Sequence, residues 1–128
     1  MSKNETPLTR RYWEQVGGLL IEEFQIVRGT RNSSPRYVDG LIVLGEPPAI
    51  SASRHIEIRD RDVIVIQTKA QRLGMYLMGQ ALFSKQLVEK MGPRSVRSVA
   101  LCTKDDATLR PLLEAFDGCE VVIHQPQQ

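Results

Sequence analysis

The chain has 128 residues, of which 41% are hydrophobic, 25% charged and 5% aromatic. This length and composition fit one globular domain and exclude disordered, collagen-like and coiled-coil proteins. Seventeen basic and fifteen acidic residues give a net charge of +2, too small by itself to indicate a polyanionic partner. No apolar stretch approaches the ~18 residues that a membrane-spanning helix needs. We expect a single cytoplasmic domain over residues 1–128, with tails at 1–7 and 125–128 and no membrane partner.

The first part of the chain predicts a helix followed by strands. Apolar residues recur at helical spacing from a capping Thr9 to Phe24, so a helix is expected there. Gly17 and Gly18 interrupt it at roughly 1 kcal/mol each, and such a pair allows another element to approach closely. The next expected elements are an extended segment at 24–29, a loop at 30–35, a strand at 36–44 and a short strand at 55–58.

The strongest predicted strand covers residues 62–69 (DVIVIQTK). Its continuous apolar run is typical of a strand covered on both faces, as in the centre of an α/β sheet. The elements expected after it are a helix at 71–91, a strand at 96–102, a helix at 105–116 and a strand at 120–124. The order α-β-β-β-α-β-α-β predicts an α/β domain with a mixed sheet and helices on its faces.

Polar residues interrupt two of the predicted strands where burial favours apolar ones. Side chains alternate between the faces of a strand, so Gln67 and Lys69 share one face and Thr68 lies on the other. Asp39 interrupts the apolar strand at 36–44. Burying an unpaired charge costs several kcal/mol, so Asp39 and Lys69 are expected to be paired, metal-bound or at an open end of the sheet. On neighbouring strands they would meet at one point, with Gln67 between them.

A carboxylate, an amide and an amine at one point suit metal-assisted hydrolysis of a phosphodiester. Asp39 would be an anionic ligand for Mg²⁺, and the side-chain oxygen of Gln67 a neutral one. The metal would lower the pKa of an attacking water. Lys69 would orient that water and add positive charge near the phosphate. Glu14, on the first helix, would supply a second carboxylate if that helix packs against the same end of the sheet.

Three short segments carry a family resemblance. They are Trp13-Glu14 with the following GGLLIEEF, VDGLIV around Asp39, and VIQTK with Gln67 and Lys69. Together they resemble the aromatic-Glu helix, the acid-glycine strand and the QxK strand of the PD-(D/E)xK nuclease superfamily, closest to its Mrr-type restriction-endonuclease-like group. The resemblance implies a restriction-endonuclease-like fold with an α-β-β-β-α-β core and a C-terminal α-β extension. It also implies a DNA endonuclease that uses Mg²⁺ or Mn²⁺, with Asp39, Gln67 and Lys69 catalytic and Glu14 accessory.

Contacts with nucleic acid are expected beside this site. The candidate residues are Arg10, Arg11, Arg28, Arg31, Arg36, Tyr76 and Gln80. Arginine contacts phosphates bidentately, although a solvated charged face and, for Tyr76, core packing are the alternatives. Cutting both strands of a duplex is easiest with two sites, which favours a homodimer, and a protein partner that supplies specificity is a further expectation.

Each candidate residue also has a structural interpretation. Asp39 with Gly40 is compatible with a turn or a bulge, Lys69 with a strand-end lysine that reaches water, and Glu14 with a solvated helix acid. Cys102 and Cys119 lack a zinc or redox spacing and are expected to be reduced and buried. Two other functions remain open. One is a catalytically inactive nuclease-fold module that binds nucleic acid or protein, and the other is a protein that oligomerises through its apolar helix.

Overall fold

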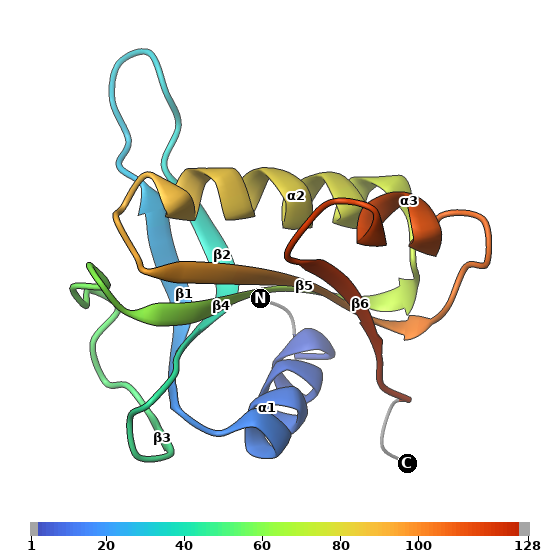
Figure 1. Cartoon of the computed structure of the whole chain (residues 1–128), viewed down its shortest axis with the longest axis horizontal. Coiled ribbons are helices and arrows are strands. Elements are labelled where there is room, and N and C mark those ends of the chain that lie inside the picture. The colour runs from blue at the N-terminus through green and yellow to red at the C-terminus, as the bar shows by residue number, and fades with distance from the viewer. Residues whose placement is uncertain (1–2, 126–128) are drawn as a thin grey trace.

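The computed structural model describes residues 3–125, which form a six-stranded mixed sheet between two layers of helices (Figure 1). The elements are α1 (Glu5–Val16), β1 (Leu19–Val27), β2 (Arg36–Val43), β3 (Ala49–Ile50), β4 (Asp62–Arg72), α2 (Met75–Glu89), β5 (Ser95–Lys104), α3 (Arg110–Glu114) and β6 (Cys119–Ile123). Helices α2 and α3 cover one face of the sheet, and α1 covers the other. The predicted α/β class and mixed sheet are confirmed.

The strand order is β3-β1-β2-β4-β5-β6. β1, β2 and β4 are antiparallel neighbours, whereas β4, β5 and β6 run parallel. Parallel neighbours need crossover connections, which α2 and α3 supply. The β1–β2 hairpin needs none, and its tip projects past α2, away from the body of the protein (Figure 1).

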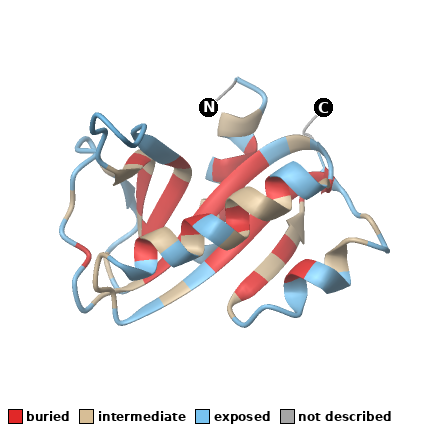
Figure 2. Cartoon of the chain, turned by 90° about the horizontal axis from the view of Figure 1, so that it is seen from above, coloured by how far each residue is buried: buried red, intermediate tan, exposed pale blue. Residues whose placement is uncertain are grey.

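The alternation predicted for the central strand β4 is confirmed on both faces. Val63 and Val65 pack on the α2 side, in a cluster that contains Val88 of that helix. Ile64 and Ile66 pack on the α1 side, together with Leu8 and Tyr12 of α1. Buried segments accordingly run along the sheet beneath α2 (Figure 2).

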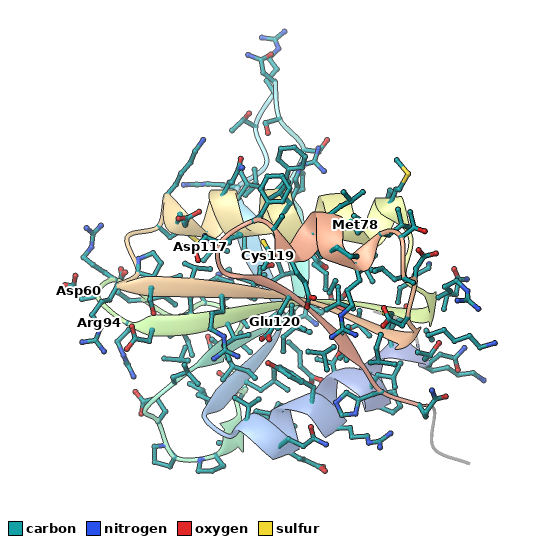
Figure 3. The ribbon with its side chains drawn as sticks, turned by 45° about the vertical axis from the view of Figure 1, so that its right-hand side comes forward. Asp60, Met78, Arg94, Asp117, Cys119 and Glu120 are labelled. Carbon is teal, nitrogen blue, oxygen red and sulfur yellow. The ribbon has the colours of Figure 1, made fainter. Side chains whose placement is uncertain are left out.

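The same alternation continues to the edge strand β6. Cys119 is buried beside α2 and α3, in a cluster with Leu77 and Leu113. Its neighbour Glu120 lies on the other side of the sheet, where it forms an ion pair with Arg97 at 2.9 Å (Figure 3). Both cysteines are free and buried, as predicted.

The helix predicted from Thr9 to Phe24 is wrong in its second half. α1 ends at Val16, and residues 19–27 form strand β1. Gly17 and Gly18 stop the helix because their φ angles are +84° and +80°. The predicted close approach at this pair is confirmed, since a Cβ on Gly18 would lie 2.7 Å from the carbonyl oxygen of Val43.

The expected N-terminal tail is also partly wrong, because helix α1 already begins at Glu5. Residues 1–2 and 126–128, which belong to the expected tails, lie outside the described residues. Within the described part, no helix is both long enough and apolar enough to cross a membrane.

Three other element boundaries differ from the prediction. No strand forms at 55–58, because the Ser51 and Ser53 hydroxyls accept the N–H groups of Ser53 and His55 and hold a loop. β4 continues to Arg72 through pairing with Lys104, which delays α2 to Met75. The last helix spans only residues 110–114.

The Asp106 carboxylate stabilises a turn that precedes this short last helix. It accepts the N–H groups of Thr108 and Leu109 at 3.0 and 2.9 Å and holds a turn there. The α3 helix therefore begins only at Arg110.

Candidate functional site

The Asp39 carboxylate lies at the point where β2 and β4 separate. The last registered pair of these strands is Gly40 with Ile66. One residue further along β2, Oδ2 of Asp39 accepts a hydrogen bond of 2.7 Å from the backbone N–H of Thr68. A side chain thus replaces a backbone carbonyl in the ladder, and it holds the carboxylate between the two strands at the open end of their pairing.

The strand on the other side of Asp39 is strained at this level. Glu22 pairs with Gly40 and Phe24 with Val38, so Glu23 lies opposite Asp39. Glu23 has φ of +53°, a left-handed conformation that non-glycine residues rarely adopt inside a strand. Strained residues of this kind cluster at functional sites.

Burial is the main influence on the pKa of Asp39. Burial raises the pKa of its carboxyl group, and the carboxylates of Glu23 and Glu5 raise it further, against the hydrogen bond from Thr68, which lowers it. Ionised Asp39 is therefore disfavoured chiefly by desolvation, with a smaller contribution from the two acids. A bound cation would relieve both effects, which is the electrostatic condition expected of a metal-binding carboxylate.

Glu5, and not Glu14, is the α1 carboxylate that reaches the sheet. Oε2 of Glu5 accepts the backbone N–H of Ala70 on β4 at 3.3 Å. The hydroxyls of Thr9 and Thr68 are joined by a buried hydrogen bond of 2.7 Å, which fixes the same turn of α1 against β4. Glu14 is exposed, on the helix face turned away from the sheet.

A helical pattern in the sequence was the signal for Glu5. Residues 5, 8, 9 and 12 share one face of a helix, and Leu8, Thr9 and Tyr12 are the buried residues of α1. The apolar spacing predicts a helix that begins at Thr9 and therefore assigns Glu5 to the N-terminal tail. With that boundary, Glu5 is not recognised as part of the buried helix face.

Gln67 and Lys69 lie on the α2 side of β4, as the alternation predicts. Gln67 is 5% exposed, and its Nε2 donates to Oγ of Ser84 on α2 at 2.8 Å. Lys69 is exposed, two residues further along the strand. No ion pair or hydrogen bond within residues 3–125 joins Asp39 to either side chain. The sequence predicts that Asp39 and Lys69 are paired, metal-bound or at an open end of the sheet. The described contacts agree with the last of these, because both residues lie where β2 and β4 separate and they do not pair with each other.

The predicted nucleic-acid contacts divide into two groups. Arg10 is committed to Glu22 through two bonds of 2.9 Å, and Arg11 donates to the backbone oxygen of Gln125. Arg31 is exposed in the β1–β2 hairpin, whereas Arg36 and Gln80 line the same pocket as Gln67. The second group lies on the α2 side of the candidate site.

The donor set at this site fits a hydrated hard cation better than a fully ligated metal. No group of three or more His, Cys, Asp and Glu side chains in the described part of the chain is arranged to enclose a metal ion. Mg²⁺, however, keeps several waters and takes one or two carboxylates. Asp39 and Glu5 supply these one or two carboxylates, and Thr68 holds one oxygen of Asp39 in place.

Comparisons with protein-family models, with curated proteins and with solved structures find no match to this chain.

Proposed function

We propose that the protein is a metal-dependent DNA endonuclease with a restriction-endonuclease-like fold. The observation that carries this proposal is the Asp39 carboxylate at the separation of β2 and β4, hydrogen-bonded to the residue between Gln67 and Lys69. The element order also supports it. Apart from the two-residue β3, the order α1-β1-β2-β4-α2-β5 agrees with the core that the sequence resemblance implies, and α3 with β6 agrees with the extension.

In this proposal Asp39 and Glu5 would hold Mg²⁺ together with waters. The amide of Gln67 is hydrogen-bonded to Ser84 on the α2 side of β4, so it faces away from Glu5 and is not one of the ligands. The ion would supply Lewis-acid activation of water and charge neutralisation at the phosphate. Thr68 orients the Asp39 carboxylate through its N–H. This contact limits the rotation of the Asp39 side chain, as the outer shell of a metal site does.

Lys69 would act on the phosphate and the attacking water. Its ammonium group is exposed at the open end of β4, where a phosphate can approach. A fixed positive charge beside the reacting phosphate stabilises the negative charge that develops in the transition state.

Replacing Lys69 with alanine is expected to lower cleavage of supercoiled plasmid in Mg²⁺ by roughly 10²–10³-fold, the loss typical of one transition-state donor. The matched control is Lys104→Ala, because Lys104 is also an exposed lysine at the end of a strand, on neighbouring β5. The wild-type protein should lose activity in EDTA. Cleavage that survives EDTA, or equal rates for the two variants, would contradict the proposal. DNA binding without cleavage in Mg²⁺ or Mn²⁺ would instead support the inactive nuclease-fold module.

The pair Glu5→Gln and Glu14→Gln tests which acid of α1 belongs to the site. Glutamine at position 5 keeps an acceptor for Ala70 but removes the charge near Asp39. We expect the Mg²⁺ concentration for half-maximal cleavage to rise about tenfold, since the loss of one charged ligand is of order 1–2 kcal/mol. Glu14→Gln should leave it unchanged. A larger rise in this Mg²⁺ concentration for Glu14→Gln than for Glu5→Gln would mean that Glu14 is the accessory carboxylate, as the sequence resemblance implies.

A further inference from the structure

A pocket of about 530 Å³ lies between α2 and the β1–β2 hairpin, on the α2 side of the candidate site. This volume falls within the roughly 300–1,000 Å³ of small-ligand sites. Its lining includes Arg36, Tyr37, Gln67, Tyr76, Gln80 and Phe83. Gln67 connects the pocket to the site, because its amide lies in the pocket wall while its strand neighbour Thr68 holds Asp39.

Exposed apolar side chains concentrate at this pocket. Eight large hydrophobic residues are exposed in the described chain, and four of them line it: Tyr37, Met75, Tyr76 and Phe83. Phe83 and Tyr37 are 59% and 48% exposed as whole residues. Exposed aromatic rings in a polar setting are the platforms on which unstacked nucleobases bind.

The rest of the lining combines Ile26, Gly79 and Leu87 with polar residues, none of which is acidic. Gln67, Gln80 and Ser84 bring amide and hydroxyl groups, which hydrogen-bond to the edges of bases, and the only charged lining residue is Arg36. No carboxylate lines this pocket among the residues that the structure describes. A site with aromatic, amide and guanidinium groups matches a nucleotide better than a cationic or purely apolar ligand.

The adjacent hairpin carries positive charge that pairs with no acid among the described residues. Residues 28–36 (RGTRNSSPR) contain three arginines and no acid. Within residues 3–125, Arg28, Arg31 and Arg36 form no ion pair. By contrast, the arginines that do pair with acids are Arg10, Arg61, Arg94, Arg97 and Arg110. Because the hairpin projects past α2 (Figure 1), these charges extend beyond the pocket rim, where the phosphates of a bound strand would run.

We propose that this pocket binds an unpaired nucleotide of the DNA substrate. The base stacks on the rings of Tyr37 and Phe83, its edge meets Gln67 and Gln80, and the flanking phosphates contact the arginines of the hairpin. This inference rests on the proposed function, since it makes the nuclease selective for DNA that contains an unpaired nucleotide beside the bond to be cut.

The test compares two duplexes of equal length, one fully paired and one with a single unpaired 2-aminopurine nucleotide. Binding is followed by fluorescence anisotropy in EDTA, so that no cleavage occurs. We expect the second duplex to bind at least about tenfold more tightly, with quenching of 2-aminopurine fluorescence as its base stacks on the protein. Equal affinity for the two duplexes, or no quenching, would overturn the inference.

Matched variants localise the effect. Phe83→Ala and Tyr37→Ala should each remove most of the preference, and Phe83→Tyr should retain it because the ring remains. Phe116→Ala is the control, since Phe116 is 51% exposed but lies outside the pocket, after α3. A preference that persists in Phe83→Ala and Tyr37→Ala, or that is lost equally in Phe116→Ala, would overturn the assignment to this pocket.

The two proposals fail separately in these experiments. Selective, Phe83-dependent binding by a protein that never cleaves DNA would refute the nuclease function and leave the nucleotide pocket. Lys69-dependent cleavage that is indifferent to an unpaired nucleotide would refute the pocket and leave the nuclease.

Discussion

Replacing Asp39 with asparagine is expected to abolish cleavage and at the same time to stabilise the fold. Asparagine keeps an oxygen that accepts the N–H of Thr68, so the ladder contact survives. It removes a charge that burial and the carboxylates of Glu23 and Glu5 disfavour. We expect the free energy of unfolding without metal to rise by roughly 0.5–2 kcal/mol, the usual size of a stabilising substitution.

The loss of cleavage follows from the same charge. A metal ion contributes several kcal/mol to transition-state stabilisation, so losing its anionic ligand should lower the rate about 10³-fold or more. Plasmid cleavage and urea unfolding, both on Asp39→Asn and the wild type, measure the two effects. A variant that is inactive and also less stable than the wild type would mean that Asp39 has a structural role only.

The pH dependence of this stability difference has a definite sign. The pKa of Asp39 is raised above its ordinary value of 3.8, so the folded protein holds the proton more tightly than the unfolded chain. Ionised Asp39 therefore destabilises the fold above its folded pKa, and this penalty disappears below the unfolded value. The advantage of Asp39→Asn should be largest near about pH 7 and shrink toward about pH 4. An advantage independent of pH would show that charge is not its cause.

Gly18→Ala is expected to be the most destabilising of the small substitutions, and Gly17→Ala is its matched control. Both glycines have φ near +80°, at +80° for Gly18 and +84° for Gly17, a conformation that strains an L residue. Such strain is of order 1–3 kcal/mol. Only at Gly18 would the new Cβ also collide, at 2.7 Å from the Val43 oxygen and 2.9 Å from Cγ2 of Ile42. At Gly17 nothing lies within 4 Å of it.

The collision at Gly18 adds a further ~1–3 kcal/mol, because the backbone of β2 cannot move without breaking its pairing. The Gly18 carbonyl also accepts the indole N–H of Trp13 at 2.8 Å, so a shift of this residue would disturb α1 as well. Urea unfolding should therefore show a clearly larger loss for Gly18→Ala than for Gly17→Ala. Equal losses would mean that strain alone limits both positions.

The sequence by itself determined the central strand and the order of elements around it. The apolar run within 62–69 indicates burial on both faces, and residues 63–68 are indeed buried. Backbone geometry makes their side chains alternate whatever surrounds them. Val63, Val65 and Gln67 therefore face α2, while Ile64, Ile66 and Thr68 face α1. The alternation of later strands with helices likewise indicates a mixed sheet from sequence alone.

Only the tertiary structure decided which way the ambiguous segments fold. Leu19, Leu20 and Phe24 fit a helical spacing but are also compatible with a strand, and pairing of Leu19 with Val43 selects the strand. The site depends on similar long-range choices. The Asp39 carboxylate meets the Thr68 backbone, and Glu5 meets Ala70 across 65 positions of sequence. Hydrogen bonds between residues so far apart are set by the register and packing of whole elements, which local spacing does not encode.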